Sequence, residues 1–279
     1  MKILVTFILA SLAISSKAQE DCSASACSST NVALKEAALT ADPTRHYYIG
    51  GMFNVHEAGD DPYVCGNIRP SGVVNLEAFL WAIEKYAPQH YSQVTVGGFA
   101  MDSCSRDERA VENVYSFETC RTYYTNVSPR NTVAFVGPEL SSQAMEVGKL
   151  LSDMKRTLVS PGAKSTMLND DMFSFFLRTT PSIKAEVNTM VKFLNMKGVK
   201  YVQVLYKGTY GMDYMQAFTM ASNGTMCITQ SNEIGSSATE ITNALMVSEA
   251  TQVVLLFADE IYSKMVLQAV NANPTVKNK

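Results

Sequence analysis

The stretch DMFSFFLRTTPSIKAE, from Asp171 to Glu186, contains the transition that decides how this chain is organised. An aromatic run of strand-forming residues ends at Arg178, and a helix-like segment begins after Thr180-Pro181. Two interpretations fit this pattern. The chain either makes an ordinary strand-to-helix turn here, or it passes between two lobes beside a ligand cleft.

Short apolar runs typical of strands alternate with segments of helical spacing on both sides of this stretch. The predicted strands are 47–53, 94–101, 132–136, 157–160, 173–178, 201–206, 226–234 and 253–257. The predicted helices are 73–86, 108–119, 141–154, 185–196, 212–221, 239–246 and 261–270. This alternation predicts an α/β fold with parallel sheets covered on both faces. Ligands bind at the carboxyl ends of such strands, where Gly137-Pro138, Pro161-Gly162 and Gly208 to Gly211 fall.

The first residues have the pattern of a secretory signal, with Lys2, an apolar run from Ile3 to Ile14, and small residues up to Ala18. A signal anchor is the other interpretation, but a spanning helix needs about 20 apolar residues. We therefore expect a signal peptide over residues 1–18, cleaved after Ala18. Residues 19–45 are polar and poorly periodic, which predicts an N-terminal linker. No later stretch is long and apolar enough to span a bilayer, so the chain as given is expected to be secreted.

The composition limits the possible functions and partners. The formal net charge is −3 and the pI is about 5.7, so no basic surface for nucleic acid is expected. Six cysteines at 22, 27, 65, 104, 120 and 227 are expected to pair in a secreted chain, although spacing alone does not choose the pairing. Two sequons predict glycosylation at Asn126 and Asn223.

The motifs of the common enzyme and metal sites are absent from the sequence. No G-x-G-x-x-G or P-loop follows a strand, and no G-x-S-x-G elbow is present. His56-Glu57 lacks the second histidine of a zinc helix, and Asp60-Asp61 is more simply read as solvated than as a calcium site. We therefore predict no catalytic residues, no cofactor and no metal site. An enzyme on a Rossmann-like scaffold is the remaining alternative of that class.

Several separated pieces of the sequence carry a family resemblance when they are taken in order. They are GGMFNVHEAG, CGNIRPSG, LEAFLWAIE, DSCSRDE, VAFVGPELSSQAMEVGKLL, SPGAKSTMLNDDMFSFFLRTTPS, VKYVQVLYKGTYG and GTMCITQSNEI. From about Tyr47 to Val270 the chain resembles the extracellular ligand-binding domain of metabotropic glutamate receptor-like class C G-protein-coupled receptors. That domain is similar to type I periplasmic binding proteins, in which two Rossmann-like lobes close on a small ligand. The resemblance implies a first lobe over 46–180 and a partial second lobe over 181–279, with Thr180-Pro181 as the first crossing.

The resemblance also implies roles for individual residues. Cys65 and Cys104 match the disulfide of the first lobe, whereas Cys120 is open between an intermolecular bond and pairing with Cys22 or Cys27. Ser141 matches the serine that holds a ligand α-carboxylate at a helix N-terminus, where free amides favour an anion. Ser142 and Gly162 belong to the same ligand set, and Ser141 or Ser142 is also a plain N-cap candidate. Tyr210 matches the tyrosine that contacts the ligand amino group.

Three positions of the ligand set depart from the family pattern. Ile183 stands where the amino-acid-binding members carry an aspartate, Lys164 replaces a threonine, and Asn75 aligns with an arginine across a one-residue gap. Loss of the aspartate removes a charge-assisted hydrogen bond worth roughly 1.5–3 kcal/mol, so glutamate is not the expected ligand. A Lys164 that points into the cleft favours an anionic ligand without an ammonium group. The alternatives are that Lys164 lies on a solvated loop, or that the cleft binds nothing and the chain acts by association.

The function implied by the resemblance is recognition of a small amino-acid-like or anionic ligand by a receptor ectodomain. A homodimer through the first lobe is an expected partner, and a G protein would couple only through a membrane domain that this chain does not include. The chain is shorter than a complete domain, which indicates a fragment or a short form. A fragment would belong to the extracellular face of the plasma membrane. The alternative function is a secreted binding or decoy protein with no signalling part.

Overall fold

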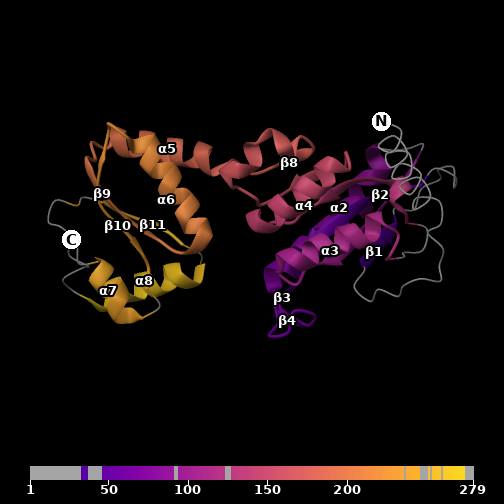
Figure 1. The fold of residues 1–279 in the computed structure, drawn as a ribbon, viewed down its shortest axis with the longest axis horizontal. Helices are drawn as coiled ribbons and strands as arrows, with labels where there is room; N and C mark the ends of the chain where they lie inside the picture. The colour runs from indigo at the N-terminus through magenta and orange to yellow at the C-terminus, as the bar shows by residue number, and fades with distance from the viewer. Residues whose placement is uncertain are drawn as a thin grey trace, which may run out of the picture. The chain divides into compact units, whose positions relative to one another are not determined.

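The computed structural model describes residues 33–36, 46–90, 94–122, 127–235, 237–245, 251, 253–258 and 260–273. The chain divides into two compact units, drawn in Figure 1. The first unit runs up to Ala163 and includes Met167–Thr180, and the second contains Lys164–Thr166 and everything from Pro181 onward. The predicted signal peptide over 1–18, most of the predicted linker and the sequon at Asn126 lie outside the described residues.

The first unit is built on a six-stranded sheet in the order β1-β5-β2-β6-β7-β8. Its strands are β1 (Ala33–Glu36), β2 (His46–Phe53), β5 (Thr95–Asp102), β6 (Thr132–Val136), β7 (Thr157–Ser160) and β8 (Phe176–Arg178). The neighbours from β5 to β8 pair in parallel, and β1 pairs antiparallel with β5. The strand β1 lies within the segment expected to be a linker. It was not predicted, because four residues are too few to show a strand period.

The side chains of β2 alternate between the two faces of this sheet, as the strand period requires. Tyr48 and Met52 face a core formed with the helices α3 (Asp107–Glu118) and α4 (Ser141–Asp153). Phe53 faces the other side, where its ring packs 5.4 Å from that of Phe79 on α2 (Pro70–His90). The sheet therefore carries a helix layer on each face.

Short elements complete the first unit. The strands β3 (His56–Ala58) and β4 (Cys65–Ile68) form a separate antiparallel pair. The 3-10 helices are η1 (Pro129–Asn131), η2 (Thr166–Asn169, whose first residue belongs to the second unit) and η3 (Asp171–Phe173). The strand predicted over 173–178 is shorter than expected, because Phe173 ends η3 and packs with Leu168 in a small core below α4.

The second unit is a parallel sheet in the order β10-β9-β11. Its elements are α5 (Ile183–Met196), β9 (Tyr201–Tyr206), α6 (Gly208–Ser222), β10 (Cys227–Glu233), α7 (Ala238–Leu245), β11 (Val253–Phe257) and α8 (Glu260–Ala272). Figure 1 shows α5 and α6 on one face of the sheet and α7 and α8 on the other. Val204 and Leu205, neighbours in β9, accordingly lie in two different cores. The predicted α/β fold with parallel sheets is confirmed.

Two local features place the helices that matter for the site. The hydroxyl of Ser182 accepts a hydrogen bond from the amide of Ala185 (3.3 Å) and so caps α5. In the first turn of α6, a Cβ on Gly211 would lie 2.2 Å from the carbonyl oxygen of Phe257. Glycine is required there because α6 begins directly against the end of β11.

Candidate functional site

The turns after β6 and β7 form one hydrogen-bonded region in the first unit. The hydroxyl of Ser160, the last residue of β7, donates to the carbonyl of Pro138 (2.6 Å) in the turn after β6. The same oxygen accepts from the amide of Ala163 (3.0 Å). Ser160 is buried, so these bonds fix both turns at the carboxyl edge of the sheet, which is the edge where ligands bind in parallel sheets.

The helix α4 begins at this edge. Its N-cap is Leu140, which makes no side-chain cap bond, and Ser141 is the first helical residue. The expectation that Ser141 or Ser142 caps the helix is therefore wrong. The hydroxyl of Ser142 instead donates to Asp107 at the start of α3 (2.9 Å). The amides of a first helical turn lack intrahelical acceptors and carry the positive end of the helix dipole, which suits a carboxylate.

Gly162 and Asn75 come together around Glu139, a residue that follows the Gly137-Pro138 turn. A Cβ on Gly162 would lie 2.9 Å from the carbonyl oxygen of Glu139, so the turns approach too closely for a larger residue. The side-chain amide of Asn75 donates to Glu139 Oε2 (2.7 Å). Arg69 Nη2 lies 3.1 Å from Glu139 Oε1. The carboxylate of Glu139 therefore uses the polar group that Asn75 was expected to offer a ligand.

Lys164 belongs to a second group of polar side chains, which lies in the second unit. Its ammonium lies 2.7 Å from Glu186 Oε1, and the hydroxyl of Tyr214 donates to Glu186 Oε2. The Lys164 side chain is 30% exposed and that of Glu186 28%. Lys164 is thus an ion-paired residue with a partly exposed side chain.

The protonation of this group follows from its contacts. Burial alone would raise the pKa of Glu186, but hydrogen bonds from Lys164 and Tyr214 and the positive charge of Lys164 lower the pKa below its ordinary value. Burial and the hydrogen bond to Glu186 raise the pKa of Tyr214. Near neutral pH Glu186 is therefore a carboxylate and Tyr214 a neutral phenol.

Tyr210 and Ile183 differ in exposure. Tyr210 lies in the first turn of α6, is 49% exposed, and packs its ring 5.0 Å from that of Tyr214. Ile183 is 1% exposed and packs in the core beneath α5 and α6. The side chain of Tyr210 is therefore accessible to a ligand, whereas that of Ile183 is not.

The first unit thus holds Ser141, Ser142, Gly162 and Asn75, and the second holds Lys164, Ile183 and Tyr210. Sequence reasoning missed the side chains that occupy the polar groups of Asn75 and Lys164. Glu139, which is paired with Arg69, binds Asn75, and Glu186, which accepts from Tyr214, binds Lys164. Position gave one usable signal. Glu139 follows a Gly-Pro turn at a strand end, and Glu186 lies in the first turn of the helix after Thr180-Pro181.

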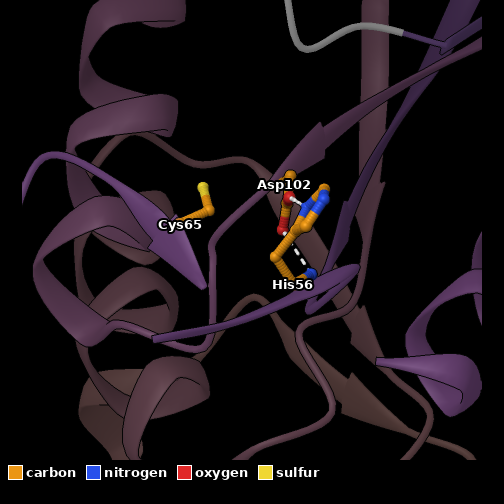
Figure 2. Close-up of side chains that lie close together, drawn as sticks. All are labelled: His56, Cys65 and Asp102. Carbon is orange, nitrogen blue, oxygen red and sulfur yellow. Dashed lines mark hydrogen bonds and ion pairs between the residues drawn. The ribbon is translucent and has the colours of Figure 1, made fainter. Parts of the chain in front are cut away.

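A further polar cluster lies beside the disulfide of the first unit. The disulfide joins Cys65 and Cys104, the pair that the family resemblance implies. Figure 2 shows His56 against Asp102, with Nδ1 2.5 Å from Oδ2, and Cys65 nearby. Ligand atoms of these three residues lie within 4.8 Å of one another. The sulfur of Cys65 is in the disulfide, however, so it is not a thiolate ligand.

Asp102 holds the backbone of this region. Its Oδ1 accepts from the amides of Val55 (3.1 Å), His56 (3.4 Å) and Cys104 (2.9 Å). The cluster therefore positions the segment after β2 and the disulfide turn.

The remaining surface predictions divide between described and undescribed residues. Asn223 is exposed just after α6, where a glycan would have access. Cys120 is disulfide-bonded, with a partner outside the described residues, and Cys227 is free and exposed. In the part of the chain that the structure describes, no helix has the length and apolarity to cross a membrane.

Both units are α/β structures built on parallel strands, with turns at the carboxyl ends of those strands, which is consistent with a fold of the periplasmic-binding-protein kind. The family model described as "Receptor family ligand binding region" matches residues 75–277. The chain belongs to this family, and it resembles the extracellular ligand-binding region of metabotropic glutamate receptor-like class C receptors.

Individual receptors are similar over most of the chain. Metabotropic glutamate receptor 8 of Mus musculus is 28% identical over 246 residues, which cover 79% of this chain and 27% of the receptor. Metabotropic glutamate receptor 4 of Mus musculus is 28% identical over 253 residues, which cover 81% of this chain and 28% of the receptor. Metabotropic glutamate receptor 6 of Oryctolagus cuniculus is 28% identical over 251 residues, covering 79% and 29%. The chain spans little more than a quarter of the length of these relatives.

Proposed function

We propose that this ligand-binding region recognises a small molecule that carries a single carboxylate, as an amino-acid-like or monoanionic ligand does. The observation that carries the proposal is the position of Ser141 in the first turn of α4, at the edge where the turns after β6 and β7 are fixed by Ser160. Amides of a helix N-terminus bind a carboxylate without a counter-cation. The family match supports the use of this edge for ligand binding.

We propose ligand contacts in each unit separately. Ser141, Ser142 and Gly162 would hold the carboxylate in the first lobe. Tyr210 would contribute an exposed aromatic face and hydroxyl from the second. Ile183 is buried and both oxygens of Glu186 are engaged, so an ammonium group of the ligand would gain little from either residue.

The charge of the ligand is limited by the ion pairs of each unit. Arg69 is paired with Glu139 and Lys164 with Glu186, so neither cation is available without loss of its partner. A second carboxylate on the ligand would find neither cation free and would lose its hydration for no new charge partner. Dicarboxylates, including glutamate, are therefore disfavoured relative to monocarboxylates of the same size.

Thermal unfolding of the secreted chain against monocarboxylates, amino acids and dicarboxylates tests this proposal. A ligand that binds the folded state raises Tm as its concentration increases. At a ligand concentration of 100 times Kd, the folded state gains about 2.7 kcal/mol of unfolding free energy. The variant Ser141→Asp should abolish the shift, because its carboxylate repels that of the ligand while suiting the helix dipole. Ser174→Asp, at an exposed serine in the turn after η3, is the matched control. A shift by dicarboxylates alone would contradict the proposal.

Signalling and assembly are further parts of the proposal. A homodimer would form through the first lobe, and a G protein would couple through a membrane domain in a longer receptor. Exposed apolar side chains of α2 support an interface there, with Val74 66%, Trp81 51% and Tyr86 45% exposed.

A secreted binding or decoy protein is the second candidate function. Sequencing of the full transcript separates the two, because a receptor requires membrane helices after Lys279. We also propose that the chain is not an enzyme. Turnover in a broad hydrolase or dehydrogenase screen would overturn that proposal.

A further inference from the structure

A pocket lies within the second unit, between α5 and α6. Its volume is about 370 Å³, within the range of small-molecule sites. Lys184 and Asn188 line it from α5, and Asp213 and Gln216 line it from α6. Each pair is spaced three or four residues apart, so its members share one helix face. We call this cavity the α5–α6 pocket.

The polar groups of the α5–α6 pocket are available to a ligand. Among the described residues, the side chains of Lys184, Asn188 and Gln216 make no hydrogen bond or ion pair. Thr166 lines one side of the pocket, and its hydroxyl is also without a partner in that part of the chain. An ammonium, two carboxamides and a hydroxyl therefore converge on one cavity with no protein group to satisfy them.

Asp213 is held in position by a buried residue. The hydroxyl of Ser165, which is 0% exposed, donates to Asp213 Oδ2 at 3.1 Å. Within the described residues Oδ1 of the same carboxylate has no partner. The acid thus keeps one carboxylate oxygen without a protein partner, and it lines the pocket from α6 whereas Lys184 lines it from α5.

The remaining wall is apolar. Ala217, Met220 and Ala221 follow Asp213 along the same face of α6, and Met220 is 78% exposed. The pocket therefore combines one cation, one anion, neutral hydrogen-bonding groups and a small apolar surface.

We propose that the α5–α6 pocket binds a small zwitterion, with its carboxylate toward Lys184 and its ammonium toward Asp213. Other ligand classes fit less well. A phosphate-like dianion would be repelled by Asp213, and a divalent cation would find one carboxylate where it needs several oxygen ligands. A wholly apolar molecule would bury both charges without partners.

The test uses the full secreted chain labelled with 13C at the methionine methyl groups, with Met220→Leu to assign the reporter signal. L-leucine should shift the Met220 signal in a saturable way. N-acetyl-L-leucine, which lacks the ammonium, and L-leucinamide, which lacks the carboxylate, should each bind at least about tenfold more weakly, because each loses one charge-assisted hydrogen bond. Equal binding of all three compounds, or no Met220 shift with leucine, would overturn the proposal.

Variants separate the pocket from other leucine sites. Lys184→Ala and Asp213→Asn should each weaken leucine binding at least about tenfold, and the asparagine keeps an acceptor for Ser165. Lys192→Ala, at an exposed lysine of the same helix outside the pocket, is the matched control. Ser141→Asp should leave the Met220 titration unchanged, so failure of this pocket and failure of the proposed receptor site are distinguishable. An unaltered leucine affinity in both pocket variants would exclude the α5–α6 pocket.

Discussion

The two units cover their parallel sheets to different extents. In the second unit both faces of the sheet pack against a pair of helices and form two apolar cores. In the first unit α3 and α4 cover one face, while α2 is the one described helix that packs on the other. An apolar pocket of about 560 Å³ lies next to α2, and its lining includes Phe79, Val136 and Pro161. The same strand-helix alternation in a sequence thus allows different degrees of burial.

This difference teaches that the stability of the two units rests on different interactions. Central strands of a parallel sheet need cover on both faces. The second unit obtains its stability from apolar burial on both faces. The first unit has a half-covered face, and a disulfide and a network around Asp102 hold the segment after β2.

Removal of the disulfide should therefore have the largest effect, and it should fall on the first unit. Cys65 and Cys104 are 39 residues apart, so the Cys65→Ser, Cys104→Ser double variant should lose about 4 kcal/mol of unfolding free energy. Cys227→Ser, in the second unit, should change stability by less than about 0.5 kcal/mol. Urea unfolding followed by near-ultraviolet circular dichroism measures both. An equal effect of the two changes would remove the contrast.

The next prediction compares the sheet face under α7 and α8 in the second unit with the face beside α2 in the first unit. Leu205 is 0% exposed under α7 and α8, so Leu205→Ala should cost about 2–5 kcal/mol. Val136 lies at the open apolar pocket of the first unit and is half-buried, so Val136→Ala should cost about 1 kcal/mol or less. Thermal and urea unfolding give both values. A cost at Val136 as large as that at Leu205 would show that the face is covered in solution.

A smaller effect concerns the ion pair of the second unit. The lowered pKa of Glu186 means that its contribution to stability is present above the unfolded value near 4.5 and is lost as pH falls through the folded pKa. Glu186→Gln should lower stability at pH 7 by on the order of 1 kcal/mol or less, since both side chains are partly exposed. The difference from the natural chain should begin to shrink as pH falls below 4.5 and should vanish below the lowered folded pKa of Glu186. Glu146→Gln, at an exposed glutamate of α4, should show no such pH dependence.

The smallest effect on stability is expected on the exposed surface of α2. Trp81→Ala should change unfolding free energy by no more than about 0.5 kcal/mol, because Trp81 is 51% exposed. It should nevertheless weaken the proposed homodimer, which analytical ultracentrifugation over a concentration series measures. Phe193→Ala, at a 56% exposed aromatic of the second unit, is the control. Equal dimerisation of all three chains would place the interface elsewhere or exclude it.

Much of the fold could be predicted because strong periodic signals agreed with tertiary packing. The predicted bounds of β6, β7, β9 and β11 coincide with those observed. The strands β1, β3 and β4 were missed, since each has at most four residues. Each depends on pairing, β1 with the distant strand β5, and β3 and β4 with each other.

The segments at the strand ends could be located from the sequence, whereas the contacts of their side chains could not. The strand-end rule for parallel sheets selects the turns that contain Ser141, Gly162 and Tyr210. The state of Asn75 and Lys164 was not predictable, because their partners Glu139 and Glu186 are 64 and 22 residues away. A contact over such a separation leaves no local pattern in a single sequence.

The sequence by itself determined the class of fold, the order of its elements and the turns at the strand ends. It could do so because hydrophobic period, glycine and proline act locally on the backbone. The tertiary structure alone decided which charges are neutralised, which aromatic side chains are exposed, and that α5 and α6 enclose a polar pocket. These properties depend on distances between segments that only folding brings together.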